Sequence, residues 1–373
     1  DLTVSNDGTL FGISSTDNKI KRISGPYLIF SVEQNESRVR KSNVSYDQGV
    51  FDSQNNFFGI KSDTTGIKRI DIQNHEEDAY LTTDYPKKMF IDNFDISGGV
   101  KTLNSSPNNV DKLYVLSTPS ANDITYPTSV TLTKYTIDNG RISESNNNKL
   151  TIDSAIDMEL SSDRQHIFIL AYKSANEARL IKLPIDFDNN TNIQSYIEIP
   201  RIDATNMGNS MTVDSNGNVY FVSNDKIKTI NSDQMTTASK ERRDLEGNVL
   251  IMNQDEVKIT SEIGESGESG ESITYRDGVI DSNDNMYFIV NNNIKKLTKS
   301  NDVVPFFSIT NIGGQGTLTN MVIDRPNDVI WTHNTEGNKI FKIDLGGAIG
   351  SNYTEWCTIT EGSGSLSAIA LAN

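Results

Sequence analysis

Three short acidic segments carry the residue types of a site for a hard cation. They read D-S-N-G-N from Asp214, D-S-N-D-N from Asp281 and D-S-Q-N-N from Asp52. Calcium takes several oxygen ligands, and an aspartate with amide side chains at alternate positions can begin such a ligand shell. Each segment, however, runs straight into an apolar stretch and lacks the acidic ligand that would close the loop. Because Asn and Gly also suit tight turns, we interpret the segments as hairpin turns and expect no metal and no cofactor.

Histidine is the side chain that most readily exchanges a proton near neutral pH, and the chain has three. Trp331 and His333 stand two positions apart in a β-like stretch, so both side chains would lie on one face of a strand. This pair is the candidate binding site; the alternative is that both residues pack between neighbouring sheets. His75 lies in a polar connection and His166 precedes an apolar run, so we expect both to be structural or exposed. No catalytic residue is assigned, because neither a nucleophile elbow nor a phosphate loop occurs.

The composition excludes several classes of partner. The formal net charge is -16, and a nucleic-acid partner would require a surplus of Lys and Arg. No apolar run is long enough to cross a bilayer, so we expect no membrane insertion. A single cysteine, Cys357, allows no disulfide within the chain. We expect a secreted or surface-displayed protein outside the cytoplasm.

A single sequence unit is repeated along the chain. The segment VDSNGNVYFVSNDKIKTI from Val213 matches IDSNDNMYFIVNNNIKKL from Ile280 at half of its positions, without a gap. Each unit has an apolar residue, a polar turn, an alternating apolar run, a loop and a K-I-K-x-I pattern. Including degenerate copies, the units start near residues 4, 51, 103, 160, 213, 280 and 323. Their spacing suits a propeller blade and is too long for leucine-rich or ankyrin repeats.

The period of each unit predicts strands. Apolar and aromatic residues alternate with period two, and N-G and N-D turns separate them. We therefore predict an all-β fold: a single seven-bladed β-propeller over residues 1–373, built from four-stranded antiparallel blades. Bulky side chains on both faces of a strand suit a sheet packed between two others. The Lys residues of the third strand would lay their stems on apolar surface.

The repeats resemble the NHL and streptogramin-lyase-like propellers, whose blades have the same pattern of apolar, turn and K-I residues. In the last copy, Trp331 and Thr332 precede Asn338, Lys339 and Ile340, which is similar to the family's W-F-T-E-x-x-x-N-K-I segment. The resemblance implies the fold and, in its enzymatic members, a metal-assisted site based on histidine or on carboxylates. His333 stands where the family has Glu, and no four metal ligands can be assigned here.

The copies differ mainly in their connections. Long connections rich in Ser, Thr, Asn, Tyr and Asp are expected at residues 33–47, 117–130 and 139–149, and an acidic insertion at 231–272. Such residues suit adaptable hydrogen bonding to a protein or a glycan. Residues 364–373 look like a surplus strand, which would either latch the ring or pair with a second copy through Leu366 to Asn373.

These features favour a non-enzymatic binding or structural propeller whose loops face a protein or glycan partner. A metal-assisted lyase or lactonase-type enzyme is the first alternative. A surface component that self-assembles through its terminal strand is the second.

Overall fold

The structure is a computed structural model of the whole chain. The residues that it describes are 2–4, 10–14, 19–23, 48–52, 56–60, 65–71, 76–80, 84–92, 94–97, 100–103, 110–120, 129–138, 141–161, 164–174, 177–188, 191, 196–200, 211–223, 226–232, 258–262, 275–298, 303–308, 317–324, 328–334, 339–347 and 353–358. Residues 364–373 and most of 231–272 lie outside this set, as does His75.

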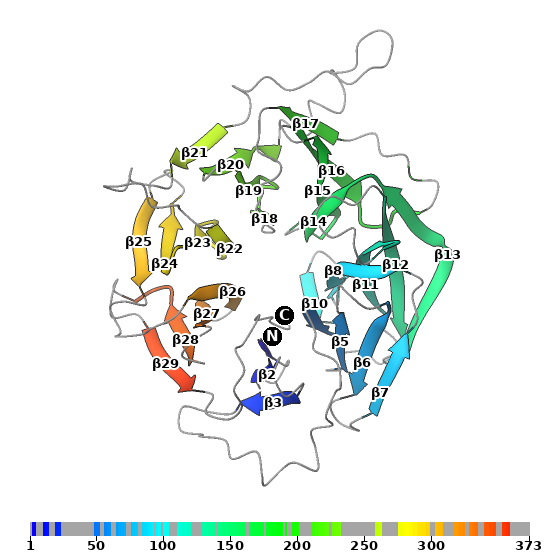
Figure 1. Ribbon diagram of the computed structural model, residues 1–373, viewed down its shortest axis with the longest axis horizontal. Helices are drawn as coiled ribbons and strands as arrows, with labels where there is room; N and C mark the ends of the chain where they lie inside the picture. Colours follow the sequence, from blue (N-terminus) through cyan, green and yellow to red (C-terminus); the bar gives the residue numbers. More distant parts are fainter. Residues whose placement is uncertain are drawn as a thin grey trace. The chain divides into compact units, whose positions relative to one another are not determined.

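The described residues form antiparallel sheets, as the alternating pattern predicts (Figure 1). The first sheet has three strands, namely β1 (Leu2–Val4), β2 (Leu10–Ser14) and β3 (Lys19–Ile23). The second has four, namely β4 (Gln48–Phe51), β5 (Asn56–Ile60), β6 (Ile67–Asp71) and β7 (Glu76–Tyr80). The third has β8 (Tyr85–Asp92), β11 (Asp111–Thr118), β12 (Val130–Asp138) and β13 (Arg141–Ile152).

Four further sheets follow the same order along the chain. The fourth has β14 (Ala155–Leu160), β15 (His166–Ser174), β16 (Glu177–Pro184) and β17 (Tyr196–Pro200). The fifth has β18 (Met211–Val213), β19 (Val219–Ser223), β20 (Lys226–Ile230) and β21 (Lys258–Glu262). The sixth has β22 (Tyr275–Ile280), β23 (Met286–Val290), β24 (Asn293–Leu297) and β25 (Val303–Ser308). The seventh has β26 (Leu318–Asp324), β27 (Val329–Asn334), β28 (Lys339–Asp344) and β29 (Tyr353–Thr358).

The third repeat differs from its expected boundary. The sequence predicts a repeat start near residue 103, but Leu103 ends a separate hairpin of β9 (Phe94–Ser97) and β10 (Val100–Leu103). The first strand of the sheet is β8, which pairs with β11 across this hairpin. The segment 139–149, expected as a loop, mostly lies in β13. In the same way, β21 lies within the segment 231–272 and forms the fourth strand of its sheet.

The chain divides into two compact units, one with residues 1–124, 131–149 and 309–373, and the other with residues 125–130 and 150–308. In the second unit the first strands of three successive sheets are neighbours, because β14 contacts β18 and β18 contacts β22. The fourth strands β17, β21 and β25 lie away from these contacts (Figure 1). The fifth sheet therefore lies between the fourth and the sixth, and these two neighbours cover its two faces within this unit.

Apolar side chains from adjacent sheets build the core of the second unit. One cluster joins the fourth and fifth sheets through side chains that include Phe168, Leu180, Met211 and Phe221. Another joins the fifth and sixth sheets, with Ile227 packed among Ile280, Met286, Phe288 and Leu297. All five residues of β23 are buried, which explains why M-Y-F-I-V is apolar on both faces.

Lysines of the third strands cover aromatic rings of the second strands. Lys182 pairs with Phe168 across β15 and β16, and its ammonium lies 5.7 Å from the ring centroid. Lys296 pairs with Tyr287 across β23 and β24, and its ammonium lies 5.4 Å from that ring. A cation over an aromatic face is attracted by the ring quadrupole, and the lysine stem covers apolar surface. This arrangement gives the recurring lysines a structural role.

Candidate functional site

The acidic segment after β18 is a hairpin turn organised by one carboxylate. Asp214 is 2% exposed. Its Oδ1 accepts hydrogen bonds from the backbone N–H groups of Asn216 (2.9 Å) and Asn218 (2.8 Å). Its Oδ2 accepts from Asn218 Nδ2 (2.7 Å) and from the Tyr220 hydroxyl (3.2 Å). Four donors therefore surround the carboxylate and hold both ends of the turn.

The turn after β22 repeats this geometry. Asp281 Oδ1 accepts from the backbone N–H groups of Asn283 and Asn285, both at 2.8 Å. Its Oδ2 accepts from Asn285 Nδ2 (2.8 Å) and from the Tyr287 hydroxyl (3.2 Å). These oxygens accept hydrogen bonds from N–H and O–H donors. The partial positive charges of the donors stabilise the buried carboxylate, as a bound cation does in a calcium loop. The hairpin interpretation of the acidic segments agrees with this geometry.

The acidic segment in the second sheet uses its aspartate in a similar way. Asp52 accepts from the backbone N–H and from the Nδ2 of Asn56, both at 2.7 Å. Among the residues that the structure describes, no group of three or more His, Cys, Asp or Glu side chains could hold a metal ion.

The two best-matched copies differ at the fourth position of their turns. Gly217 has φ +79°, and Asp284 occupies the equivalent position with φ +61°. An aspartate tolerates this left-handed conformation better than most residues but still less well than glycine. The Asp284 carboxylate accepts hydrogen bonds from the backbone N–H (2.9 Å) and the hydroxyl (2.6 Å) of Ser215. The side chain that the sixth repeat adds therefore ties its turn to the turn of the fifth.

Replacing Gly217 with alanine is expected to lower the free energy of unfolding by about 1–2 kcal/mol, the cost of a β-carbon in the left-handed region. The added Cβ would also lie 3.4 Å from Ser232 Cβ. Gly346→Ala is the matched control, because no atom lies within 4 Å of the place that its Cβ would take and its backbone φ is not in the left-handed region. Urea unfolding followed by circular dichroism measures both. Equal effects of the two substitutions would contradict the assigned turn geometry.

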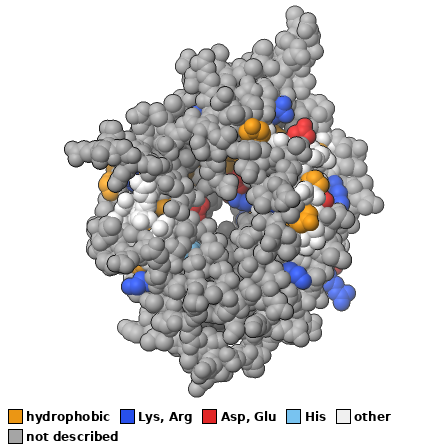
Figure 2. Space-filling view, in the orientation of Figure 1, with side chains coloured by type: hydrophobic (Ala, Val, Ile, Leu, Met, Phe, Trp, Pro, Cys, Tyr) orange, Lys and Arg blue, Asp and Glu red, His pale blue; other side chains and the backbone are white. Residues whose placement is uncertain are grey.

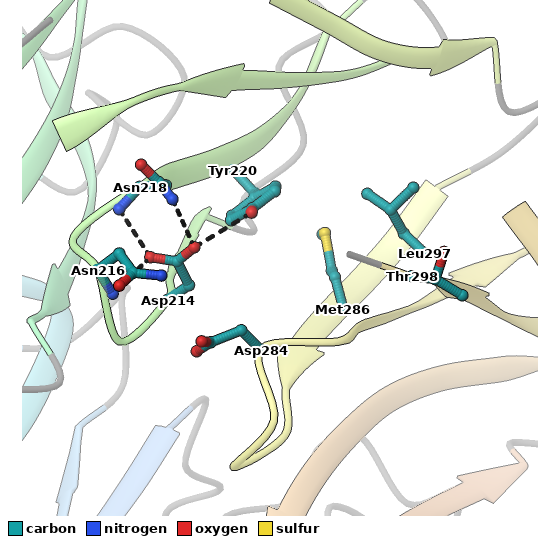
Figure 3. Close-up of a pocket in the computed structure, with 8 residues that line it drawn as sticks. All are labelled: Asp214, Asn216, Asn218, Tyr220, Asp284, Met286, Leu297 and Thr298. Carbon is teal, nitrogen blue, oxygen red and sulfur yellow. Dashed lines mark hydrogen bonds between the residues drawn. The ribbon is translucent and has the colours of Figure 1, made fainter. Parts of the chain in front are cut away.

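A cavity of about 230 Å³ lies between the two tied turns, within the second unit (Figure 3). We call it the turn cavity. Its lining residues are Asp214, Asn216, Asn218, Tyr220, Asp284, Met286, Leu297 and Thr298. Figure 3 shows the Asp284 carboxylate on the side of Asp214 and Asn216, with Met286 beyond Tyr220. The cavity thus combines two carboxylates and amide groups with an aromatic ring and apolar side chains.

The turn cavity is lined by two carboxylates and a protonated phenol. Burial and the neighbouring Asp214 carboxylate raise the pKa of the Tyr220 hydroxyl above its ordinary value of 10.0. The phenol therefore stays protonated at neutral pH and acts as a donor to Asp214. The eight described lining residues include no histidine, lysine or cysteine. These residues can orient a ligand and attract a positive charge.

The sequence-predicted pair lies elsewhere in the fold. Trp331 and His333 are both in β27, and neither lines the turn cavity. His333 is fully buried, whereas Trp331 is partly exposed. Burial lowers the pKa of His333 from 6.5 to about 3, so the ring is neutral at physiological pH. His166 begins β15 and is half-buried.

The residues that sequence reasoning missed are Asp284 and Ser215. The available signal was the replacement of glycine by aspartate at the fourth position of one turn, since that position requires positive φ. An aspartate there raises the conformational energy of the backbone, and a favourable contact of its side chain can offset this energy. Differences between copies at special backbone positions are thus better indicators of a site than the shared residues.

No family model matches this chain, and no curated protein matches it. Solved structures do, and their likeness shows a β-propeller fold. The propeller of Dos1 is 10% identical with a TM-score of 0.55, covering 100% of this chain and 79% of that one. A catalytically inactive virginiamycin B lyase from Staphylococcus aureus, solved with quinupristin, is 13% identical with a TM-score of 0.50, covering 89% and 90%. Raptor from Chaetomium thermophilum is 12% identical with a TM-score of 0.51, covering 84% of this chain and 25% of that one.

At these identities the likeness shows the fold alone. One of the similar structures is a lyase, but a shared fold carries no statement about the activity of this chain, because one fold hosts many unrelated functions. The expected resemblance to streptogramin-lyase-like propellers is confirmed at the level of the fold. In the described part of the chain, no helix has the length and hydropathy that crossing a bilayer requires.

Proposed function

We propose that this chain is a seven-bladed β-propeller that works as a binding or structural module and presents polar connections to a protein or glycan partner. The observation that carries this proposal is that the aspartates of the acidic segments are engaged in holding their own hairpins together. Asp214 and Asp281 each accept four hydrogen bonds from their own turns. Groups engaged in this way position loops and are poorly placed to bind a catalytic metal.

The arrangement of the sheets supports the same role. Rigid sheets covered on both faces hold the connections at fixed positions, and binding residues in many folds lie on loops held by such a scaffold. On the face shown in Figure 2, hydrophobic side chains of the described residues lie in small separate groups. Among the described residues, the large hydrophobic side chain that is exposed is Val110, with 41% of its surface accessible. In the described part of the surface, such small groups favour polar recognition over a broad apolar interface.

Three parts of this proposal stay predictions. They are a ring of seven four-stranded blades, self-association through residues 366–373, and a location outside the cytoplasm. Trp331 and His333 likewise stay a candidate binding pair. Native mass measurement of the whole chain and of a chain without residues 366–373 tests self-association.

The experiment that tests the function measures binding and turnover on the same preparation. Saturable binding to a defined glycan on an array or to a purified protein, unchanged by EDTA, is expected. Quinupristin with Mg²⁺, followed by liquid chromatography, and a panel of lactones test the enzymatic alternative. Metal-dependent ring opening of any of these substrates would overturn the proposal.

A further inference from the structure

The surroundings of Tyr220 have a counterpart in the next repeat, and the two differ at one described position. Tyr220 and Tyr287 occupy equivalent positions, and each donates its hydroxyl to the aspartate of its own turn at 3.2 Å. Over the Tyr287 ring lies the ammonium of Lys296, 5.4 Å from the centroid. The residue paired with Tyr220 in the same register is Thr229, whose short side chain carries no charge.

We infer that the turn cavity binds a lysine side chain of a protein partner, which takes beside Tyr220 the place that Lys296 takes beside Tyr287. This inference rests on the proposed binding function and names the chemistry of one of its contacts. An ammonium beside a tyrosine ring is attracted by the ring's negative face, more strongly where water is excluded. The fold itself therefore supplies the precedent for the ligand.

The charge of the cavity agrees with this occupant. Asp214 and Asp284 line it, and its eight described lining residues include no positive charge. The whole chain carries a net charge of -16, which favours the approach of a basic partner. A lysine carries a compact charge on a flexible stem. It does not require two carboxylate oxygens that are both available as acceptors, whereas a bidentate arginine does. That difference matters because both oxygens of Asp284 already accept hydrogen bonds from Ser215.

The apolar side chains of the cavity suit the lysine stem. Met286 and Leu297 are 2% and 3% exposed and belong to the core between the fifth and sixth sheets. A methionine side chain adapts its shape to a neighbouring group, and the methylene stem of lysine readily covers apolar atoms. The cavity thus provides apolar contact for the stem and negative charge for the ammonium in one place.

The test is a titration of the whole chain, labelled with ¹³C at its methionine methyl groups, with a short acetylated and amidated peptide that contains one lysine. The Met286 methyl signal is expected to shift saturably with a millimolar Kd, while the signal of Met158, which does not line the cavity, stays unchanged. The same peptide with norleucine in place of lysine keeps the stem without the charge. It is expected to bind about two- to fivefold more weakly, the effect of a partly exposed charge pair.

Two variants make the inference falsifiable. Thr229→Lys should place the chain's own ammonium beside Tyr220 and abolish the Met286 response to the peptide. Asn216→Asp, at an exposed position, adds a carboxylate to the rim and should strengthen peptide binding about two- to fivefold in the presence of EDTA. Three results would each overturn the inference. The Met286 signal does not shift, the norleucine peptide binds as tightly as the lysine peptide, or the Thr229→Lys variant binds the lysine peptide as the wild type does.

The outcomes also separate this inference from the proposed function. A protein partner that binds the wild type and Thr229→Lys equally would overturn the lysine site and leave the binding function standing. Metal-dependent turnover together with lysine-peptide binding would overturn the binding function and leave the lysine site standing.

Discussion

Replacing Asp157 with alanine is expected to lower the free energy of unfolding by about 3 kcal/mol. Asp157 is 2% exposed and lies at the β-bulge of β14. Its Oδ1 accepts a hydrogen bond from the backbone N–H of Met158 (2.8 Å), and its Oδ2 accepts from the backbone N–H of Met211 (2.9 Å) in the first strand of the next sheet. Alanine would leave both buried N–H groups without this acceptor, and each such loss costs about 1–3 kcal/mol.

Urea unfolding followed by circular dichroism at pH 7.5 measures this effect. Asp157→Asn keeps an oxygen for one of the two donors and should cost less than Asp157→Ala. Asp153→Ala is the matched control, because Asp153 is exposed in the same part of the chain and its loss should change stability by less than about 0.5 kcal/mol. Similar losses for Asp157→Ala and Asp153→Ala would show that the bridge between β14 and β18 contributes nothing.

Acidification is expected to destabilise the protein through His333. The folded chain holds the pKa of this histidine at about 3, whereas the unfolded chain restores the ordinary value of 6.5. Between these two values the unfolded state binds a proton that the folded state excludes, so stability falls as the pH falls from 6.5 towards 3. At pH 5 the loss from this one group is about 2 kcal/mol relative to pH 8, at about 1.36 kcal/mol for each pH unit.

The measurement compares the urea midpoint of the wild type and of His333→Asn across pH 8 to pH 5. The variant carries its own packing loss at every pH, so the decisive quantity is the change of stability with pH. Above pH 7 both proteins should show the same pH dependence, which serves as the internal control. Below pH 6.5 the wild type should lose stability more steeply than the variant. Parallel curves over the whole range would contradict a neutral, buried His333.

The sheets were predictable wherever the repeat keeps its turn. In the fifth repeat the sequence predicts strands at 210–214, 218–223 and 226–230, and the structure has β18, β19 and β20 within one residue of these bounds. In the third repeat the signature is interrupted. There β8 reads Y-P-K-K-M-F-I-D, and an inserted hairpin separates it from its partner β11. A search for the repeated turn could therefore not find the first strand.

Two outer strands, β13 and β21, lie in segments that the sequence predicts as connections, and β13 shows the physical reason. β13 reads R-I-S-E-S-N-N-N-K-L-T-I, with few apolar residues, because one side of a sheet's last strand has no neighbouring strand. Alternation is strong only where both faces are buried, as in β23. The site depends even more on tertiary structure. The contact between Ser215 and Asp284 joins residues 69 positions apart, and the local sequence marks Asp284 as unusual without naming Ser215 as its partner.

The contact between Ser215 and Asp284 also makes two nearly identical neighbouring turns different from each other in the folded chain. Chains with nearly identical adjacent repeats can mispair, because a strand of one repeat can enter the sheet of the next. The turns of the fifth and sixth repeats are otherwise alike, and their fourth position, Gly217 in one and Asp284 in the other, gives each turn a distinct surface. In the folded chain the aspartate lies against Ser215 of the preceding repeat. A single substitution between duplicated turns thus identifies which copy belongs beside which.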